Sequence, residues 1–157
     1  MKIKRKGREF VVRVFAPEEL GDDFYRLAGR FFASATVRAE LGVSMTVADN
    51  DWWFLVEAAA EHEAKASLVG VVGLSGVGVN ASGTVGTVKY VYIVPDLKKE
   101  LYDAVLGRVV HFVESKMEKM KTLQTTCHES TASMYAKHGF QEVSRRGQYV
   151  KMTRGKE

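Results

Sequence analysis

Residues 128–140 read H-E-S-T-A-S-M-Y-A-K-H-G-F, and the run before them, T-L-Q-T-T-C at residues 122–127, is rich in β-branched side chains. This run predicts a strand, and residues 130–138 predict a helix that ends at Gly139 as its C-cap. Tyr135 then lies one turn before that glycine, on a short helix behind a strand edge. A phenol in such a place is a candidate proton donor.

The rest of the chain predicts one α/β domain over residues 1–157, built as mixed α+β layers without regular βαβ alternation. We expect a helix starting near Pro17, a possible second helix within residues 36–48 and a long amphipathic helix of about six turns after Pro95. A polar turn is expected at residues 61–66. The predicted strands cover residues 9–15, 52–58, 67–76, 84–94, 122–127, 140–144 and 148–153.

Composition and charge exclude few functions. The formal net charge of +4 favours anionic ligands without specifying one. We interpret the basic residues at 2–8 and at 145–146 as solvated surface, with a nucleic-acid site as the less favoured alternative, because no aromatic residue interleaves them. We expect a cytoplasmic protein without an export signal or membrane span, and no metal site, because the four histidines show no ligand spacing.

The stretch that ends at Phe140 resembles the second cofactor motif of the GCN5-related N-acetyltransferases, roughly N-x-x-A-x-x-L-Y-E-K-x-G-F. Tyr135, Lys137 and the pair Gly139-Phe140 match it, and Met134 stands for leucine. His128 occupies the asparagine position and Thr131 the alanine position. The resemblance extends to the order of elements over nearly the whole chain. It implies a central mixed sheet of about six to seven strands flanked by helices, with a splayed parallel central pair.

In this family acetyl-coenzyme A lies between the splayed strands, which would be residues 88–94 and 122–127 here. The resemblance thus implies cofactor contacts from Tyr92, Ile93 and Val94 on the first strand, and from Ser130 and Tyr135 beyond the second. The oxyanion donor would be a backbone N–H near Tyr92 or Ile93.

The family's earlier motif, R/Q-x-x-G-x-G/A, binds the pyrophosphate through backbone amides that glycine leaves bare. This chain reads V-P-D-L-K-K-E-L-Y-D at residues 94–103 and has neither glycine. Lys98 and Lys99 are candidate phosphate ligands as point charges. The alternative is that both lysines simply begin an exposed helix.

Acyl transfer to an amine needs a neutral amine, a donor for the developing negative charge and a proton for the leaving thiolate. The resemblance implies that Tyr135 donates this proton to the thiolate. The alternative is that Tyr135 is only an aromatic packing residue. His128 is a candidate base or cofactor ligand, although a histidine at a strand-to-helix junction is more often structural. Glu57 and Glu129 are further candidate bases, and Cys127 is expected to be a buried apolar residue.

Three functions follow as hypotheses. The first is an acyl-CoA-dependent N-acyltransferase that moves an acetyl group from acetyl-CoA to a small-molecule or protein amine in a ternary complex. The acceptor would enter near the first helices and near Trp52 and Trp53. The second is a non-catalytic acetyltransferase-like module that binds a protein or nucleic acid. The third is a transferase with an altered donor. The sequence leaves open whether the chain forms a homodimer.

Overall fold

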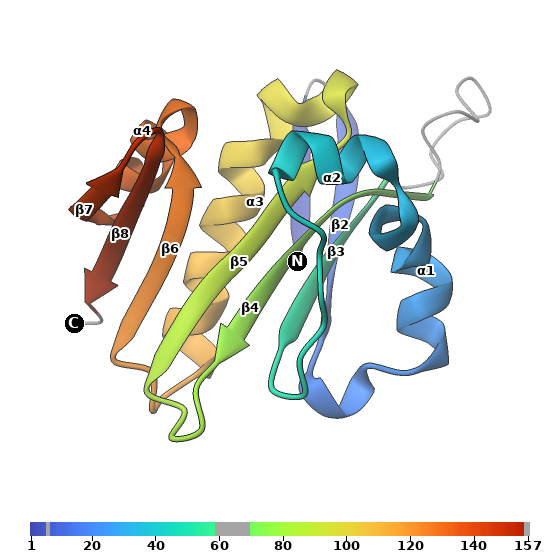
Figure 1. Ribbon diagram of the computed structural model, residues 1–157. Helices are drawn as coiled ribbons and strands as arrows, with labels where there is room; N and C mark the ends of the chain where they lie inside the picture. Colours follow the sequence, from blue (N-terminus) through green and yellow to red (C-terminus); the bar gives the residue numbers. More distant parts are fainter. Residues whose placement is uncertain (6, 59–69, 156–157) are drawn as a thin grey trace.

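A computed structural model describes residues 1–5, 7–58 and 70–155. Its centre is one sheet of eight strands in the order β1-β2-β3-β4-β5-β6-β8-β7 (Figure 1). Neighbouring strands are antiparallel except for β5 and β6, which are parallel. The strands are β1 (Lys2–Arg5), β2 (Arg8–Phe15), β3 (Trp52–Ala58), β4 (Gly70–Val79), β5 (Val85–Ile93), β6 (Thr122–His128), β7 (Gln141–Arg146) and β8 (Tyr149–Gly155).

Helices cover both faces of this sheet. On one face lie α1 (Asp22–Ala33) and α2 (Ala35–Leu41), and on the other lies α3 (Pro95–Lys116) (Figure 1). A 3₁₀ turn, η3 (Glu129–Thr131), leads from β6 into α4 (Ala132–Lys137). The mixed α/β fold class that the sequence predicted is therefore confirmed, and so is the parallel central pair.

Two apolar layers, one on each face, explain why the central strands are almost continuously hydrophobic. Phe24 and Phe31 of α1 pack with Trp53 on one side of the sheet. Leu101 and Val105 of α3 pack on the other side, in a larger cluster that also contains Tyr135 and Phe140. Among the described residues, no helix combines the length and the apolar character needed to cross a membrane.

Two features near the N-terminus differ from the prediction. Pro17 begins a 3₁₀ turn, η1 (Pro17–Glu19), and the α-helix starts only at Asp22. Strand β1 was not predicted, because its alternation places only Ile3 in the core among charged neighbours. The expected turn at residues 61–66 and the start of the strand expected from residue 67 lie outside the described residues.

The parallel pair separates partway along its length. Strands β5 and β6 pair over only four positions, from Val85 opposite Thr122 to Val88 opposite Thr125. On the other edge of β5, Val88 faces Val77 and Tyr90 faces Gly76, so Lys89 is an extra, bulged residue. A bulge bends its strand and ends pairing locally. The bulge at Lys89 therefore coincides with the point at which β5 diverges from β6.

Candidate active site

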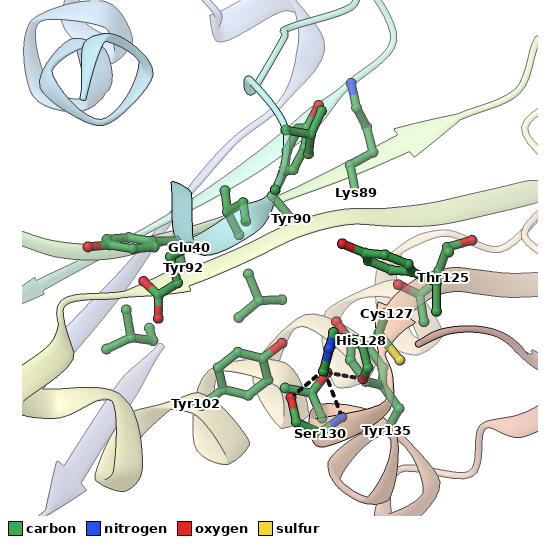
Figure 2. Close-up of a pocket in the computed structure, with 18 of the residues that line it drawn as sticks. Glu40, Lys89, Tyr90, Tyr92, Tyr102, Thr125, Cys127, His128, Ser130 and Tyr135 are labelled. Atoms are coloured by element: carbon green, nitrogen blue, oxygen red, sulfur yellow. Dashed lines mark hydrogen bonds between the residues drawn. The ribbon is translucent and has the colours of Figure 1, made fainter. Parts of the chain in front are cut away.

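The divergence of β5 and β6 opens a cavity of about 690 Å³. Residues 89–93 of β5 and residues 125–128 of β6 form its two sides, and residues 39–43 at the end of α2 border it. Figure 2 shows Tyr102, Ser130 and Tyr135 along one side, with Tyr90 and Tyr92 on the other. The remaining lining residues are Lys98, Thr131, Gln148 and Tyr149. The gap that the sequence resemblance implied is thus present and open.

The backbone of β5 presents polar groups to this cavity. The Val94 N–H donates to the Val72 carbonyl of β4 at 2.9 Å, so Val94 and, by alternation, Tyr92 direct their N–H groups toward β4. The N–H groups of Val91 and Ile93 then point the other way, into the gap. Tyr92 and Ile93 were the residues expected to supply an oxyanion donor. Of these two, only Ile93 directs its N–H into the gap. Val94 does not line the cavity.

Tyr135 lies at the inner end of the cavity and is only 3% exposed. Its hydroxyl interacts with the hydroxyls of Tyr102 and Thr125. Burial, together with the charge and hydrogen bond of Tyr102, raises the pKa of Tyr135 well above its usual 10. The phenol of Tyr135 is consequently neutral at physiological pH and acts there as a hydrogen-bond donor.

Tyr102 is a second phenol in the cavity, and sequence reasoning did not assign it to the site. Burial raises the pKa of Tyr102, while hydrogen bonds to Tyr135 and Thr131 lower it. The hydroxyls of Tyr102 and Tyr135 thus interact with each other inside the cavity. Tyr102 sits on the second turn of α3, within the stretch where the family motif has glycine.

His128 caps the 3₁₀ turn η3 and also lines the cavity. Its Nδ1 accepts the Ser130 N–H at 3.1 Å and lies 2.9 Å from the Ser130 hydroxyl (Figure 2). Its Nε2 lies 3.4 Å from the side-chain oxygen of Gln148. A neutral His128 ring therefore carries its proton on Nε2. In this arrangement both ring nitrogens of His128 and the Ser130 hydroxyl already have partners.

Cys127 fits the expectation of a buried apolar residue. Its side chain is 7% exposed, and Sγ lies 3.9 Å from Met152 Sδ. Burial raises the pKa of the Cys127 thiol, which keeps the thiol protonated and unreactive at neutral pH. The adjacent His128 uses both ring nitrogens elsewhere, so no base accompanies this thiol.

The two lysines expected near the phosphates behave differently. Lys98 lines the cavity, and its Nζ lies 2.7 Å from Glu40 Oε1, so this ion pair joins α2 to α3. Lys99 is exposed and does not line the cavity. Sequence reasoning missed Glu40, because the short helix α2 carries no motif that singles it out. The Glu40 carboxylate adds to burial in raising the pKa of Tyr92, which places its charge beside the cavity.

The other candidates lie away from the cavity. Glu57 pairs with Arg13 at 3.0 Å, and Glu129 pairs with Arg145 at 3.0 Å. Trp53 is fully buried against α1, and Trp52 packs against Phe112 on the opposite face of the sheet. Among the residues that the structure describes, no cluster of three His, Cys, Asp or Glu side chains could hold a metal ion.

Comparison with known proteins rests on structure alone. No protein-family model matches the sequence, and no curated protein is significantly similar to it. Escherichia coli ElaA superposes with a TM-score of 0.67 at 14% identity, over 92% of this chain and 99% of ElaA. A GNAT-family acetyltransferase from Listeria monocytogenes gives a TM-score of 0.65 at 14% identity, over 99% of both chains.

A third structure, Campylobacter jejuni N-acetyltransferase PseH in complex with acetyl coenzyme A, gives a TM-score of 0.58 at 11% identity. The superposition covers 94% of this chain and 100% of PseH. At these identities the likeness concerns the fold, and it spans almost the full length of each chain. This chain therefore has the fold of the GCN5-related N-acetyltransferases, as its second cofactor motif implied.

Proposed function

We propose that the chain is an N-acyltransferase that moves an acetyl group from the thioester of acetyl-CoA to an amine by direct attack in a ternary complex. The observation that carries this proposal is the open cavity between β5 and β6. The unpaired edge of β5 can bind the amide-containing arm of a thioester by adding backbone hydrogen bonds, as an extra strand does. We leave the acceptor as a small-molecule or protein amine.

The reaction proceeds by one exchange of bonds. The neutral amine attacks the thioester carbonyl, the C–N bond forms and the C–S bond breaks, and the amine nitrogen loses a proton. The Ile93 N–H, directed into the gap, stabilises the oxygen on which negative charge develops. The departing thiolate gains a proton, for which the cavity offers the phenols of Tyr135 and Tyr102.

The two phenols divide this task. An isolated phenol and a thiol have similar acidity, so proton transfer between them is feasible. Burial raises the pKa of both Tyr135 and Tyr102, so both phenols keep their protons at physiological pH. When one phenol gives its proton to the thiolate, a hydrogen bond from the other phenol stabilises the negative charge that it leaves. We assign the proton transfer to the pair, and His128 to shaping the cavity by capping η3.

Among the described residues that line the cavity, no unpaired carboxylate is available as a general base. Glu40 is the carboxylate among the cavity-lining residues, and it is paired with Lys98. The amine proton therefore leaves through water. The rate of transfer should rise with pH as the acceptor amine loses its proton, until the phenols begin to ionise.

Two measurements test the proposal. Acetyl-CoA should raise the melting temperature through ligand linkage, and release of free thiol should follow addition of a suitable amine from a panel of polyamines, amino sugars and lysine peptides. An unchanged melting temperature at millimolar acetyl-CoA would reject a transferase that uses acetyl-CoA. That result would favour the non-catalytic module, for which salt-sensitive retention on immobilised DNA tests the nucleic-acid form.

A further inference from the structure

We infer that this chain recognises its thioester donor by the pantetheine arm and makes little use of the ADP half of coenzyme A. The inference rests on the proposed function and narrows its donor. It follows from the start of α3 and from the charges that line the cavity.

Helix α3 leaves no loop in which a diphosphate could lie. Strand β5 ends at Ile93 and the helix begins at Pro95, with Val94 as its N-cap. A phosphate site at a helix start needs free backbone N–H groups. Pro95 has none, and the Leu97 N–H donates to the Val94 carbonyl at 3.0 Å. Asp96, in the first turn, adds a negative charge where the phosphates would approach.

Leu101 and Tyr102 occupy the region where the family has its glycines, and packing holds both side chains in place. Leu101 is fully buried and Tyr102 is 6% exposed, and both belong to the core between α3 and the sheet. Rotating either of them outward would open a cavity in that core. Side chains of the first two turns of α3 therefore pack in the core, and the backbone there is not accessible to a ligand.

The cations of the cavity are already neutralised. Lys98 Nζ lies 2.7 Å from Glu40, and Lys89 Nζ lies 2.7 Å from Asp51. These are the two lysines among the described residues that line the cavity. A diphosphate would have to break the Lys98–Glu40 pair and then lie beside the released carboxylate. The charges around Lys98 and Glu40 therefore disfavour the binding of a polyanion.

The inner part of the cavity has the opposite character. Its walls carry the Val91 and Ile93 N–H groups, the neutral phenols of Tyr102 and Tyr135 and apolar side chains of β5. An uncharged chain with two amides and a thioester, such as pantetheine, matches these donors and apolar surfaces. The site thus suits the pantetheine arm of the donor and does not suit its pyrophosphate.

Titration calorimetry with the full chain tests this division. S-acetylpantetheine and acetyl-CoA should bind with dissociation constants within about fivefold of each other, and adenosine 3′,5′-diphosphate should not bind at millimolar concentration. Two results would overturn the inference and leave the proposed transferase function standing. One is acetyl-CoA binding more than about fiftyfold tighter than S-acetylpantetheine, and the other is measurable binding of adenosine 3′,5′-diphosphate alone. If neither thioester binds, both the inference and the proposed function fail.

A charge variant sharpens the result. Glu40→Gln removes the carboxylate and frees Lys98, so it should tighten acetyl-CoA binding by about tenfold and leave S-acetylpantetheine unchanged. Glu57→Gln is the matched control, because Glu57 forms a similar ion pair with Arg13 away from the cavity. An equal effect of Glu40→Gln on both donors would show that the Glu40–Lys98 pair does not set phosphate recognition, which contradicts the inference.

Discussion

Lys89, the bulged residue of β5, is held by Asp51 in the loop before β3. Lys89 Nζ lies 2.7 Å from Asp51 Oδ2 and also donates to the Thr46 carbonyl at 3.1 Å. The Asp51 side chain is 2% exposed and accepts the Ala48 N–H at 2.8 Å. This pair therefore ties the bulge at which β5 leaves β6 to the loop that follows α2.

The first prediction concerns this ion pair. Lys89→Met should lower the free energy of unfolding by about 3 kcal/mol, because it leaves a buried carboxylate without its counter-charge. Asp51→Asn should have a smaller effect, because Lys89 remains partly exposed and keeps the Thr46 carbonyl. Chemical denaturation measures both. The double variant should be less destabilised than the sum of the single ones, and simple additivity would argue against the coupling.

The second prediction contrasts two glycines. A Cβ at Gly76 would lie 2.9 Å from the ring of Trp53, which is fully buried. Gly76→Ala should therefore destabilise the protein by about 1–3 kcal/mol through overpacking. Gly29 lies in α1, where a Cβ meets nothing within 4 Å, so Gly29→Ala should stabilise by about 0.5–1 kcal/mol. Thermal or chemical unfolding measures the stability change of each variant. Stability changes of the same sign in both variants would contradict the packing around Trp53.

The third prediction tests the phenol pair. Tyr135→Phe should slow the transfer step by about 10²-fold, in the range of a lost acid catalyst, while thioester binding changes little. Tyr102→Phe should also slow transfer, and the double variant should be hardly slower than Tyr135→Phe, because the two hydroxyls act as a unit. Stopped-flow thiol release gives the rates. Turnover of Tyr135→Phe at the wild-type rate would remove this residue from the mechanism.

The fourth prediction concerns alkaline pH. The folded-state pKa values of Tyr102 and Tyr135 lie above the ordinary value of 10. Between the ordinary and the raised pKa, the unfolded chain loses protons that the folded chain keeps, so stability is full below about pH 10 and falls above it. The Tyr102→Phe, Tyr135→Phe double variant should lose less stability on going from pH 9 to pH 11. Urea denaturation at both pH values measures this difference, and an identical loss would contradict the assigned shifts.

The sequence predicted the fold well where local signals and packing agree. The strand at residues 52–58 and the long helix after Pro95 appear as β3 and α3. The C-cap of α4 is His138, one residue before the predicted Gly139, and Gly139 follows it with a φ of 87°, which favours glycine. Strand β1 was missed because a basic surface strand with one buried residue, Ile3, has almost no hydrophobic pattern.

The predicted residues that line the cavity are those that the family resemblance singled out, including Tyr92, Ile93 and Lys98. Tyr135, His128 and Ser130 line the cavity, and all three belong to the stretch at residues 128–140. Glu40 and Tyr102 reach the same cavity from α2 and α3, and only the tertiary fold brings these helices together.

The short ladder between β5 and β6 has a mechanical consequence. Strands β1 to β5 are joined to strands β6, β8 and β7 by a ladder of only four residue pairs, between β5 and β6. An occupant that touches both walls of the cavity adds links across this junction that the main chain itself does not make. We therefore expect an occupant of the cavity to reduce the relative motion of the two portions of the sheet.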